Sequence, residues 1–294
     1  MLECIWLELL TKVVYRKPRE SVYSRRFFGD LSSGYSYYLG KKGIGDFYKF
    51  VPENCKTAEL IKSNGSYDLS NTIEELVYAI ISSLVTYGRA IVYIDKNINI
   101  NEDGEKIISS IQIGYVRGLV HRTKKDKCML HCISFDGKLK SQEVARKQII
   151  QFRLRDIGMR NNYFAKINDR LAKNDITEVS SELVASESSG YDFLYHNRKS
   201  KINAIRLTHK IGWTFGFEDL SDSQIIYNKI IIDKLRIKLL EYTLLKLNDG
   251  LRICLGEDAG QINAEVKDVD YDLLWDKFQR GEISFSEIND VLFQ

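Results

Sequence analysis

Proline is almost missing from this chain, and cysteine is sparse and scattered. Only two of the 294 residues are proline and 19 are glycine, so a collagen-like repeat is excluded. The five cysteines, Cys4, Cys55, Cys128, Cys132 and Cys254, are odd in number and widely spaced, which excludes a dense disulfide scaffold. Cysteines used in this way are typical of a reducing, cytoplasmic environment.

Long hydrophobic runs are also missing. No window reaches the roughly 18 consecutive apolar residues that a membrane span requires, so we expect no membrane partner. The first ten residues lack a basic start and include Glu3 and Glu8, so no signal peptide is expected there. The rest of the composition, with 44% hydrophobic and 28% charged residues and a net charge of +3, is typical of a globular protein.

The small net charge conceals a gradient along the chain. Residues 117–173 contain fifteen Lys/Arg against five Asp/Glu, whereas residues 250–294 contain four against ten. Such asymmetry indicates either a surface for nucleic acid beside an oppositely charged neighbour, or solvated faces that simply differ in sign.

The first 68 residues carry the weakest pattern. Leu2–Val14 has apolar residues at roughly helical spacing, which predicts a short amphipathic helix. Tyr15–Lys49 is rich in Tyr, Arg, Gly and Ser, which predicts an extended arm or loops outside the core. Its interleaved basic and aromatic residues suit nucleic acid, a neighbouring subunit or an ordinary surface.

The clearest helix begins near Ser70 and ends before Gly88. Thr72 and Glu75, or Asn71 and Glu74, have capping-box spacing. Its apolar residues lie on one face at helical spacing: Ile73, Leu76, Val77, Ile80, Ile81, Leu84 and Val85. Gly88 suits the left-handed conformation that closes a helix, and the β-branched residues 90–94 then predict a strand.

Residues 90–155 alternate between apolar and polar side chains in several short segments. The alternation is partial over Ile108, Ile111, Ile113 and Tyr115, strict over Met129, His131, Ile133 and Phe135, and recurs at Ile150, Phe152 and Leu154. We therefore predict a small antiparallel sheet packed on the helix of residues 72–86, an α+β unit.

Helices dominate the expectation for the rest of the chain. Two short helices are predicted within residues 160–190, whereas residues 202–217 stay unassigned. Asp219–Asn248 predicts one long helix that ends at Asn248-Asp249-Gly250. Residues 261–266 then alternate as a strand, and helices are predicted around Trp275 and from Ser286.

No residues form a recognisable catalytic or metal motif. His121, Cys128, His131 and Cys132 are zinc-type ligands, but adjacent strand residues such as His131 and Cys132 point to opposite faces, so no metal is expected. The glycines of residues 40–45 lack the Walker spacing, and there is no Gly-x-Ser-x-Gly elbow. The acids near Asp270 precede a helix, where they favour the macrodipole. We expect neither an enzyme nor a cofactor.

Two segments resemble the portal proteins of tailed bacteriophages, the rings through which DNA enters the capsid. The first is Glu75–Asp95, in which Tyr87, Gly88, Arg89 and Ala90 follow a helix and precede a strand, with Arg89 where such portals usually have Asn. The second is Gly281–Glu287, which is similar to the Gly-x-Ile-Thr-x-Asn-Glu pattern of many portal cores, with Ser286 in place of Asn.

The resemblance implies a division into five segments. They are residues 1–68, an N-terminal arm and helix; 69–158, a wing-like α+β domain; 159–217, a connecting region; 218–250, a stem-like helix; and 251–294, a C-terminal strand and helices.

The resemblance implies a mechanical role in the virion, with assembly in the host cytoplasm. A ring, expected to contain twelve copies, would hold double-stranded DNA and dock terminase, neck or adaptor, and capsid proteins, while the motor ATPase performs the catalysis. Channel-facing or neighbour-facing candidates lie on the long helix: Lys229, Lys234, Arg236 and Lys238. The candidate basic surface comprises Arg117, Arg122, Lys124, Lys125, Arg153 and Arg155. The candidate acidic contact with the next copy comprises Asp270, Asp272 and Asp276.

Two other classes of function remain open from the sequence. In one, a monomer or dimer binds nucleic acid without sequence preference through residues 117–173. In the other, the chain is a nuclease or transferase with no readable motif. The mass of the purified protein separates a ring from a small binding protein.

Overall fold

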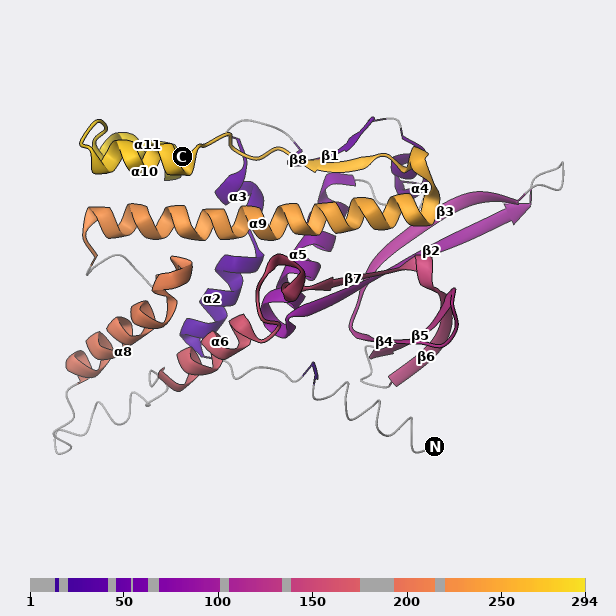
Figure 1. The fold of residues 1–294 in the computed structure, drawn as a ribbon, viewed down its shortest axis with the longest axis horizontal. Helices are drawn as coiled ribbons and strands as arrows, with labels where there is room; N and C mark the ends of the chain where they lie inside the picture. The colour runs from indigo at the N-terminus through magenta and orange to yellow at the C-terminus, as the bar shows by residue number, and fades with distance from the viewer. Residues whose placement is uncertain are drawn as a thin grey trace. The chain divides into compact units, whose positions relative to one another are not determined.

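The computed structural model describes residues 14–15, 21–41, 46–53, 55–62, 69–100, 106–133, 139–174, 193–214 and 220–293 (Figure 1). The chain is α+β, as predicted, and forms two compact units from discontinuous segments. Unit 1 comprises residues 1–17, 43–161 and 239–265, and unit 2 comprises residues 18–42, 162–238 and 266–294. None of the described helices is both long and apolar enough to cross a membrane.

Unit 1 is built around the predicted helix and sheet. Helix α5 (Leu69–Tyr87) packs on an antiparallel sheet of order β3-β2-β7, formed by β3 (Lys106–Val116), β2 (Arg89–Ile100) and β7 (Ile149–Arg153). The register pairs Ala90 with Phe152, and both side chains are buried. The Tyr115 hydroxyl donates to Ser83 Oγ of α5 at 2.9 Å, so α5 covers this face of the sheet. Ile80 of α5 is fully buried, as predicted.

The junction between α5 and β2 depends on Gly88. Its φ of +72° is the left-handed conformation that glycine adopts easily, and its N–H donates to the Leu84 carbonyl at 2.8 Å. A Cβ at this position would lie 1.8 Å from the Asn161 carbonyl oxygen. Gly88 is therefore required both by the turn and by the close approach of a second backbone segment.

The predicted single sheet is in fact two sheets. Strands β4 (Gly118–Arg122), β5 (Lys127–Ile133) and β6 (Leu139–Ala145) form a separate antiparallel sheet of order β4-β5-β6. Its Cys128, Leu130 and Val144 pack with Ile91 of β2. The turn expected at residues 136–137 lies outside the described residues.

The rest of unit 1 includes helix α4 (Lys56–Lys62) and a two-stranded sheet of β1 (Tyr48–Val51) and β8 (Gln261–Ala264). Strand β8 is two residues shorter than expected. Cys55, Cys128 and Cys254 are buried free thiols in this unit, and Cys132 is half-buried. Burial raises the pKa of the Cys128 and Cys254 thiols.

Unit 2 corrects the prediction of an exposed arm over Tyr15–Lys49. Residues 22–39 form helices α2 (Val22–Ser32) and α3 (Tyr35–Leu39). Their buried residues recur every four positions: Tyr23, Phe27, Leu31, Tyr35 and Leu39. The expected loops were wrong because the intervening Arg, Gly and Ser residues hide this spacing. The helix expected over Leu2–Val14 lies almost wholly outside the described residues.

The described part of the connecting region is helical. Helix α6 (Tyr163–Asn174) buries Phe164 and Leu171, as predicted, whereas the second short helix expected there lies outside the described residues. Helix α8 (Phe193–Thr208) and a 3₁₀ helix (His209–Ile211) account for the described part of the unassigned segment. This segment ends at Gly212, and Trp213 beyond it is buried against Phe27.

Helix α9 (Asp222–Leu255) is the long predicted helix, but it runs beyond its expected end at Gly250. At 1.5 Å per residue its 34 residues span about 50 Å. A Cβ on Gly250 would lie 2.2 Å from Ile150 Cδ1, so the glycine accommodates a packed side chain and does not terminate the helix. Residues up to Lys238 belong to unit 2, and those from Leu239 belong to unit 1.

Helices α10 (Tyr271–Gln279) and α11 (Phe285–Phe293) close the described chain within unit 2. Tyr271, Ile288 and Leu292 pack with Ile226 and Ile230 of α9. Asp270 Oδ1 accepts from the Leu273 N–H at 3.0 Å, which caps α10.

Candidate functional site: a basic cleft in unit 1

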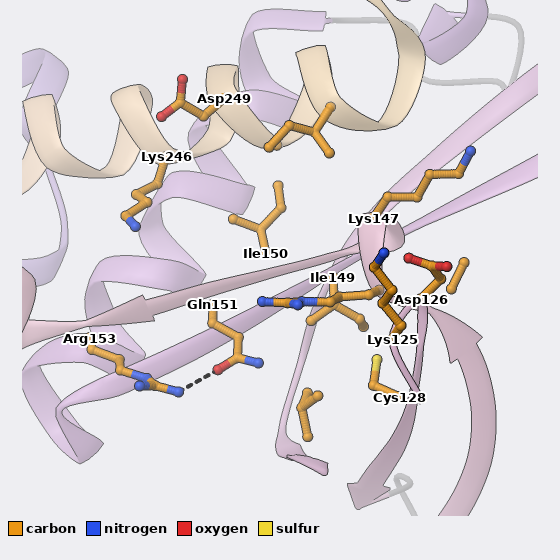
Figure 2. Close-up of a pocket in the computed structure, with 15 residues that line it drawn as sticks. Lys125, Asp126, Cys128, Lys147, Ile149, Ile150, Gln151, Arg153, Lys246 and Asp249 are labelled. Carbon is orange, nitrogen blue, oxygen red and sulfur yellow. Dashed lines mark hydrogen bonds between the residues drawn. The ribbon is translucent and has the colours of Figure 1, made fainter. Parts of the chain in front are cut away.

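A cleft of about 1120 Å³ lies beside the edge strand β7 in unit 1 (Figure 2). Ile149, Gln151 and Arg153 of β7 line it, together with Lys246 and Asp249 of α9. The turn between β4 and β5 and the 3₁₀ helix Arg146–Gln148 contribute further residues. The site is thus assembled from three segments of the chain, because the 3₁₀ helix leads directly into β7.

Positive charge dominates this cleft, which we call the basic cleft. The cations are Lys125, Arg146, Lys147, Arg153 and Lys246. The two carboxylates that line it are Asp126 and Asp249. The excess of cations attracts an anionic ligand and repels a cationic one.

The cations differ in how firmly they are held. Arg153 donates to Gln151 Oε1 at 2.7 Å, as Figure 2 shows, and Lys246 lies 3.6 Å from Asp156 Oδ2. Lys125, Arg146 and Lys147 are exposed, and their side chains have no hydrogen-bond or ion-pair partner among the described residues. These three are therefore available to an external anion.

Tyr242 fixes α9 to strand β7 beneath the cleft. Its hydroxyl accepts from the Arg153 backbone N–H at 2.8 Å and donates to Asp156 Oδ2 at 2.9 Å. Burial, aided by Asp156, raises the pKa of this phenol well above its usual value, so Tyr242 stays neutral and keeps its donor. Tyr242 thereby holds the Arg153 backbone in place, and Gln151 holds its side chain.

The basic cleft suits a polyanion. The cleft is open and has a volume of about 1120 Å³. Cations spread over such a cleft can contact the phosphates of a nucleic acid without forming sequence-specific contacts with its bases. The apolar residues between the cations, among them Val120, Ile149 and Ile253, offer nonpolar contact but no sequence-specific hydrogen bonds.

Only part of the predicted basic surface lies in this cleft. Lys125 and Arg153 line it. Lys124 and Arg155 are exposed but do not line it, and Arg155 lies 3.9 Å from Asp156 Oδ1. The side chain of Arg122 lies outside the described residues.

Arg117 serves the interior of unit 1 and not an open surface. It donates through Nη2 to the Tyr15 carbonyl at 2.8 Å and to the Tyr87 hydroxyl at 3.1 Å. Its guanidinium lies 5.7 Å and 5.3 Å from the centroids of these two rings, which is cation–π distance. Arg117 therefore ties Tyr87, at the end of α5, to Tyr15.

The portal-like motif residues are divided between the two units, with Tyr87, Gly88, Arg89 and Ala90 in unit 1 and Gly281 and Glu287 in unit 2. Arg89 lies directly opposite Arg153 in the β2–β7 register, and its buried Nε has no hydrogen-bond partner among the described residues. Ala90 is buried. In unit 2, Gly281 has a φ of +72°, and the Glu287 carboxylate accepts from the Ser284 N–H at 2.7 Å. These bonds from Ser284 lower the pKa of Glu287.

The predicted channel-facing cations of α9 are mostly engaged within unit 2. Arg236 is 3% exposed and donates to the Asp30 carbonyl and to Asp233 Oδ1. Lys229 lies 2.7 Å from Asp233 Oδ2 with 10% of its side chain exposed. Lys234 pairs with Asp272. Within the chain, Asp233 therefore pairs with both Lys229 and Arg236 in the interior of unit 2, whereas Lys238 is exposed. Whether these residues face a channel or a neighbouring copy stays a prediction.

The structure also shows the surroundings of the three aspartates predicted to contact the next copy and of the zinc-type residues. Asp270 caps α10, Asp272 pairs with Lys234, and the exposed Asp276 carboxylate has no partner among the described residues.

His131 Nδ1 lies 2.7 Å from Ser141 Oγ, and burial together with the nearby His121 lowers the pKa of His131. Cys128 and Cys132 lie on the opposite face of β5 from His131. The described residues contain no cluster of three or more metal-binding side chains.

Sequence reasoning missed Arg146, Lys147 and Lys246 as members of one site. The adjacent Arg146-Lys147 pair before β7 is a visible signal, because both lie in the strongly basic segment. Lys246 has no such signal, since only the packing of α9 on β7 brings it to the cleft. No protein-family model and no curated protein sequence matches the chain.

Proposed function

We propose that this chain is the subunit of a tailed-bacteriophage portal ring, expected to contain twelve copies. The proposal is supported by the order of elements: α5, the Gly88 junction and β2, then the long helix α9, then α10, Gly281 and α11. This order follows the two segments that resemble portal proteins. As a portal, the chain acts in the virion after assembly in the host cytoplasm.

Exposed apolar side chains on α9 carry the proposal. In unit 1, Leu245 is 62% exposed and lies outside the lining of the basic cleft, whereas Ile253, which is 64% exposed, also lines the cleft. The exposed face also bears Glu241 and Arg252, so it offers apolar contact and both signs of charge. A surface of this kind suits a heterologous contact with a second copy, and such contacts repeat around a closed ring.

In this proposal the chain works mechanically and binds no cofactor. The ring holds double-stranded DNA through loose phosphate contacts, to which the basic cleft contributes. Terminase, neck or adaptor, and capsid proteins dock on it, and catalysis belongs to the terminase motor.

The mass in solution tests the proposal. Light scattering on the purified protein should give about 400 kDa, because each chain contributes 34.0 kDa to a ring of twelve. Leu245→Asp should reduce this to the mass of small species, because it places a charge in the contact. Ile98→Asp, at a position 55% exposed on β2, should leave the ring intact. A wild-type mass of 34 kDa at high concentration would contradict the proposal.

The basic cleft favours a second candidate function, a monomeric or dimeric protein that binds nucleic acid without sequence preference. A wild-type mass of 34 or about 68 kDa together with DNA binding would favour it over the ring.

DNA binding through the cleft has its own test. Reversing Lys125 and Lys147 to Glu should weaken binding of duplex DNA of any sequence, because both side chains are exposed and unpaired at the cleft. The plot of log K against the logarithm of the salt concentration should become less steep by about 2, because each of the two lost phosphate contacts contributes about 0.9 to the slope. Lys56→Glu, an exposed lysine of α4 outside the cleft, is the matched control. An unchanged slope in the double variant would exclude the cleft.

A further inference from the structure

A second pocket, of about 370 Å³, lies within unit 2 and is separate from the basic cleft. Helices α2, α3, α9 and α11, the segment around Trp213 and the segment after β8 contribute to it. Its volume is in the range of small-molecule sites, which are about 300–1,000 Å³. We call it the unit 2 pocket.

Among the described residues, the charges at the unit 2 pocket leave one cation in excess. Lys229 and Arg236 share the carboxylate of Asp233. The Asp30 carboxylate accepts from Trp213 Nε1 at 2.7 Å. Lys267 also lines the pocket, and its ammonium has no hydrogen-bond or ion-pair partner among the described residues.

The pKa of Lys229 reflects this positive environment. Burial lowers the pKa of its ammonium, and the nearby charges of Arg236 and Lys267 lower it further, although Asp233 opposes both. An anion in the pocket would relieve the repulsion between these cations and complement the free charge of Lys267.

An amide side chain also belongs to the lining of this pocket. Asn228 is 8% exposed and lines the pocket, and its carboxamide makes no hydrogen bond to another described residue. An amide offers both donors and an acceptor. An occupant with a hydrogen-bonding edge would satisfy it.

Aromatic rings form part of the wall. The guanidinium of Arg236 lies 3.9 Å from the Tyr38 ring centroid, and Lys229 Nζ lies 5.4 Å from the centroids of both Tyr38 and Phe293. Tyr37 packs edge-on against Tyr38 at 5.1 Å and remains 79% exposed. An exposed ring beside cations favours a planar group that stacks.

We infer that the unit 2 pocket binds a small anion that carries a planar, hydrogen-bonding ring, which is the chemistry of a nucleoside monophosphate. The ring stacks on the tyrosines and hydrogen-bonds to Asn228, while Lys267 meets the phosphate. This inference does not depend on the proposed portal function, because it rests on the lining of the unit 2 pocket and on no contact between copies.

Calorimetric titration of the whole protein with AMP tests the inference. AMP should bind at one site per chain, and adenosine and inorganic phosphate should each bind at least about tenfold more weakly, because each lacks half of the recognised chemistry. Asn228→Ala and Lys267→Gln should each weaken AMP binding about tenfold. Lys277→Gln, on α10 outside the pocket, should leave it unchanged.

A further variant guards against loss of the fold. Tyr37→Ala alters a ring that is 79% exposed, so the protein should fold normally and still bind AMP several-fold more weakly. The absence of saturable AMP binding at millimolar concentration would overturn the inference. AMP binding that Asn228→Ala, Lys267→Gln and Tyr37→Ala all leave unchanged, or phosphate binding as tight as AMP binding, would equally overturn it.

Discussion

Ile80→Asp should unfold the protein, or lower its free energy of unfolding by about 4 kcal/mol or more. Ile80 is fully buried on the face of α5 that packs with the sheet, among Val77, Ile81 and Leu84, which are also fully buried. An aspartate there would lose its hydration without gaining a partner. Urea denaturation followed by circular dichroism measures the change.

A matched substitution on the same helix separates burial from helix propensity. Tyr78 is 46% exposed on α5, so Tyr78→Asp should change the free energy of unfolding by less than about 1 kcal/mol. If Ile80→Asp does not fold at all, Ile80→Ala should still fold and lose about 2–5 kcal/mol through the cavity. Equal stability of the Ile80→Asp variant and the wild-type chain would mean that α5 does not bury this face.

The second large effect is expected at Asp233. This residue is 1% exposed and carries the ion pairs of both Lys229 and Arg236. Asp233→Ala would leave two buried cations without their carboxylate, and breaking a buried pair in this way costs about 3–5 kcal/mol. Because the pairs are buried, the loss should change little between low and high salt. Thermal and urea unfolding at the two salt concentrations measure it.

The control for Asp233→Ala is another aspartate of unit 2. Asp272 pairs with Lys234, but the Asp272 side chain is 86% exposed. Its replacement by alanine should cost less than about 1 kcal/mol, and high salt should reduce that cost further. A loss at Asp233 no larger than the loss at Asp272 would show that the buried pairs contribute no stability.

Periodicity accounts for what could be predicted of the fold. The apolar stripe through Ile80 and the β-branched residues after Gly88 are local signals, and the structure has both elements at those positions. Helices α2 and α3 were missed because the repeat from Tyr23 to Leu39 is interrupted by glycines and arginines. The end of α9 was misplaced because Gly250 makes room for Ile150, a residue one hundred positions away.

The candidate site was predictable only where charge clusters along the chain. Lys125 and Arg153 follow from the basic segment, whereas Lys246 reaches the cleft through tertiary packing that no local pattern reports. The ion pairs of Arg236 with Asp233, by contrast, have a signal in the sequence. Lys229, Asp233 and Arg236 are spaced at i, i+4 and i+7, so one carboxylate can serve both cations from the same helix face.

The placement of cysteine has a consequence for how the two units can be followed separately. No cysteine falls in the segments that form unit 2, whereas Cys55, Cys128 and Cys254 are buried in unit 1. Burial keeps Cys128 and Cys254 in the thiol form, which alkylating reagents attack slowly. The rate at which these sulfurs are alkylated in the native protein therefore reports the transient opening of unit 1, and fluctuations confined to unit 2 leave it unchanged.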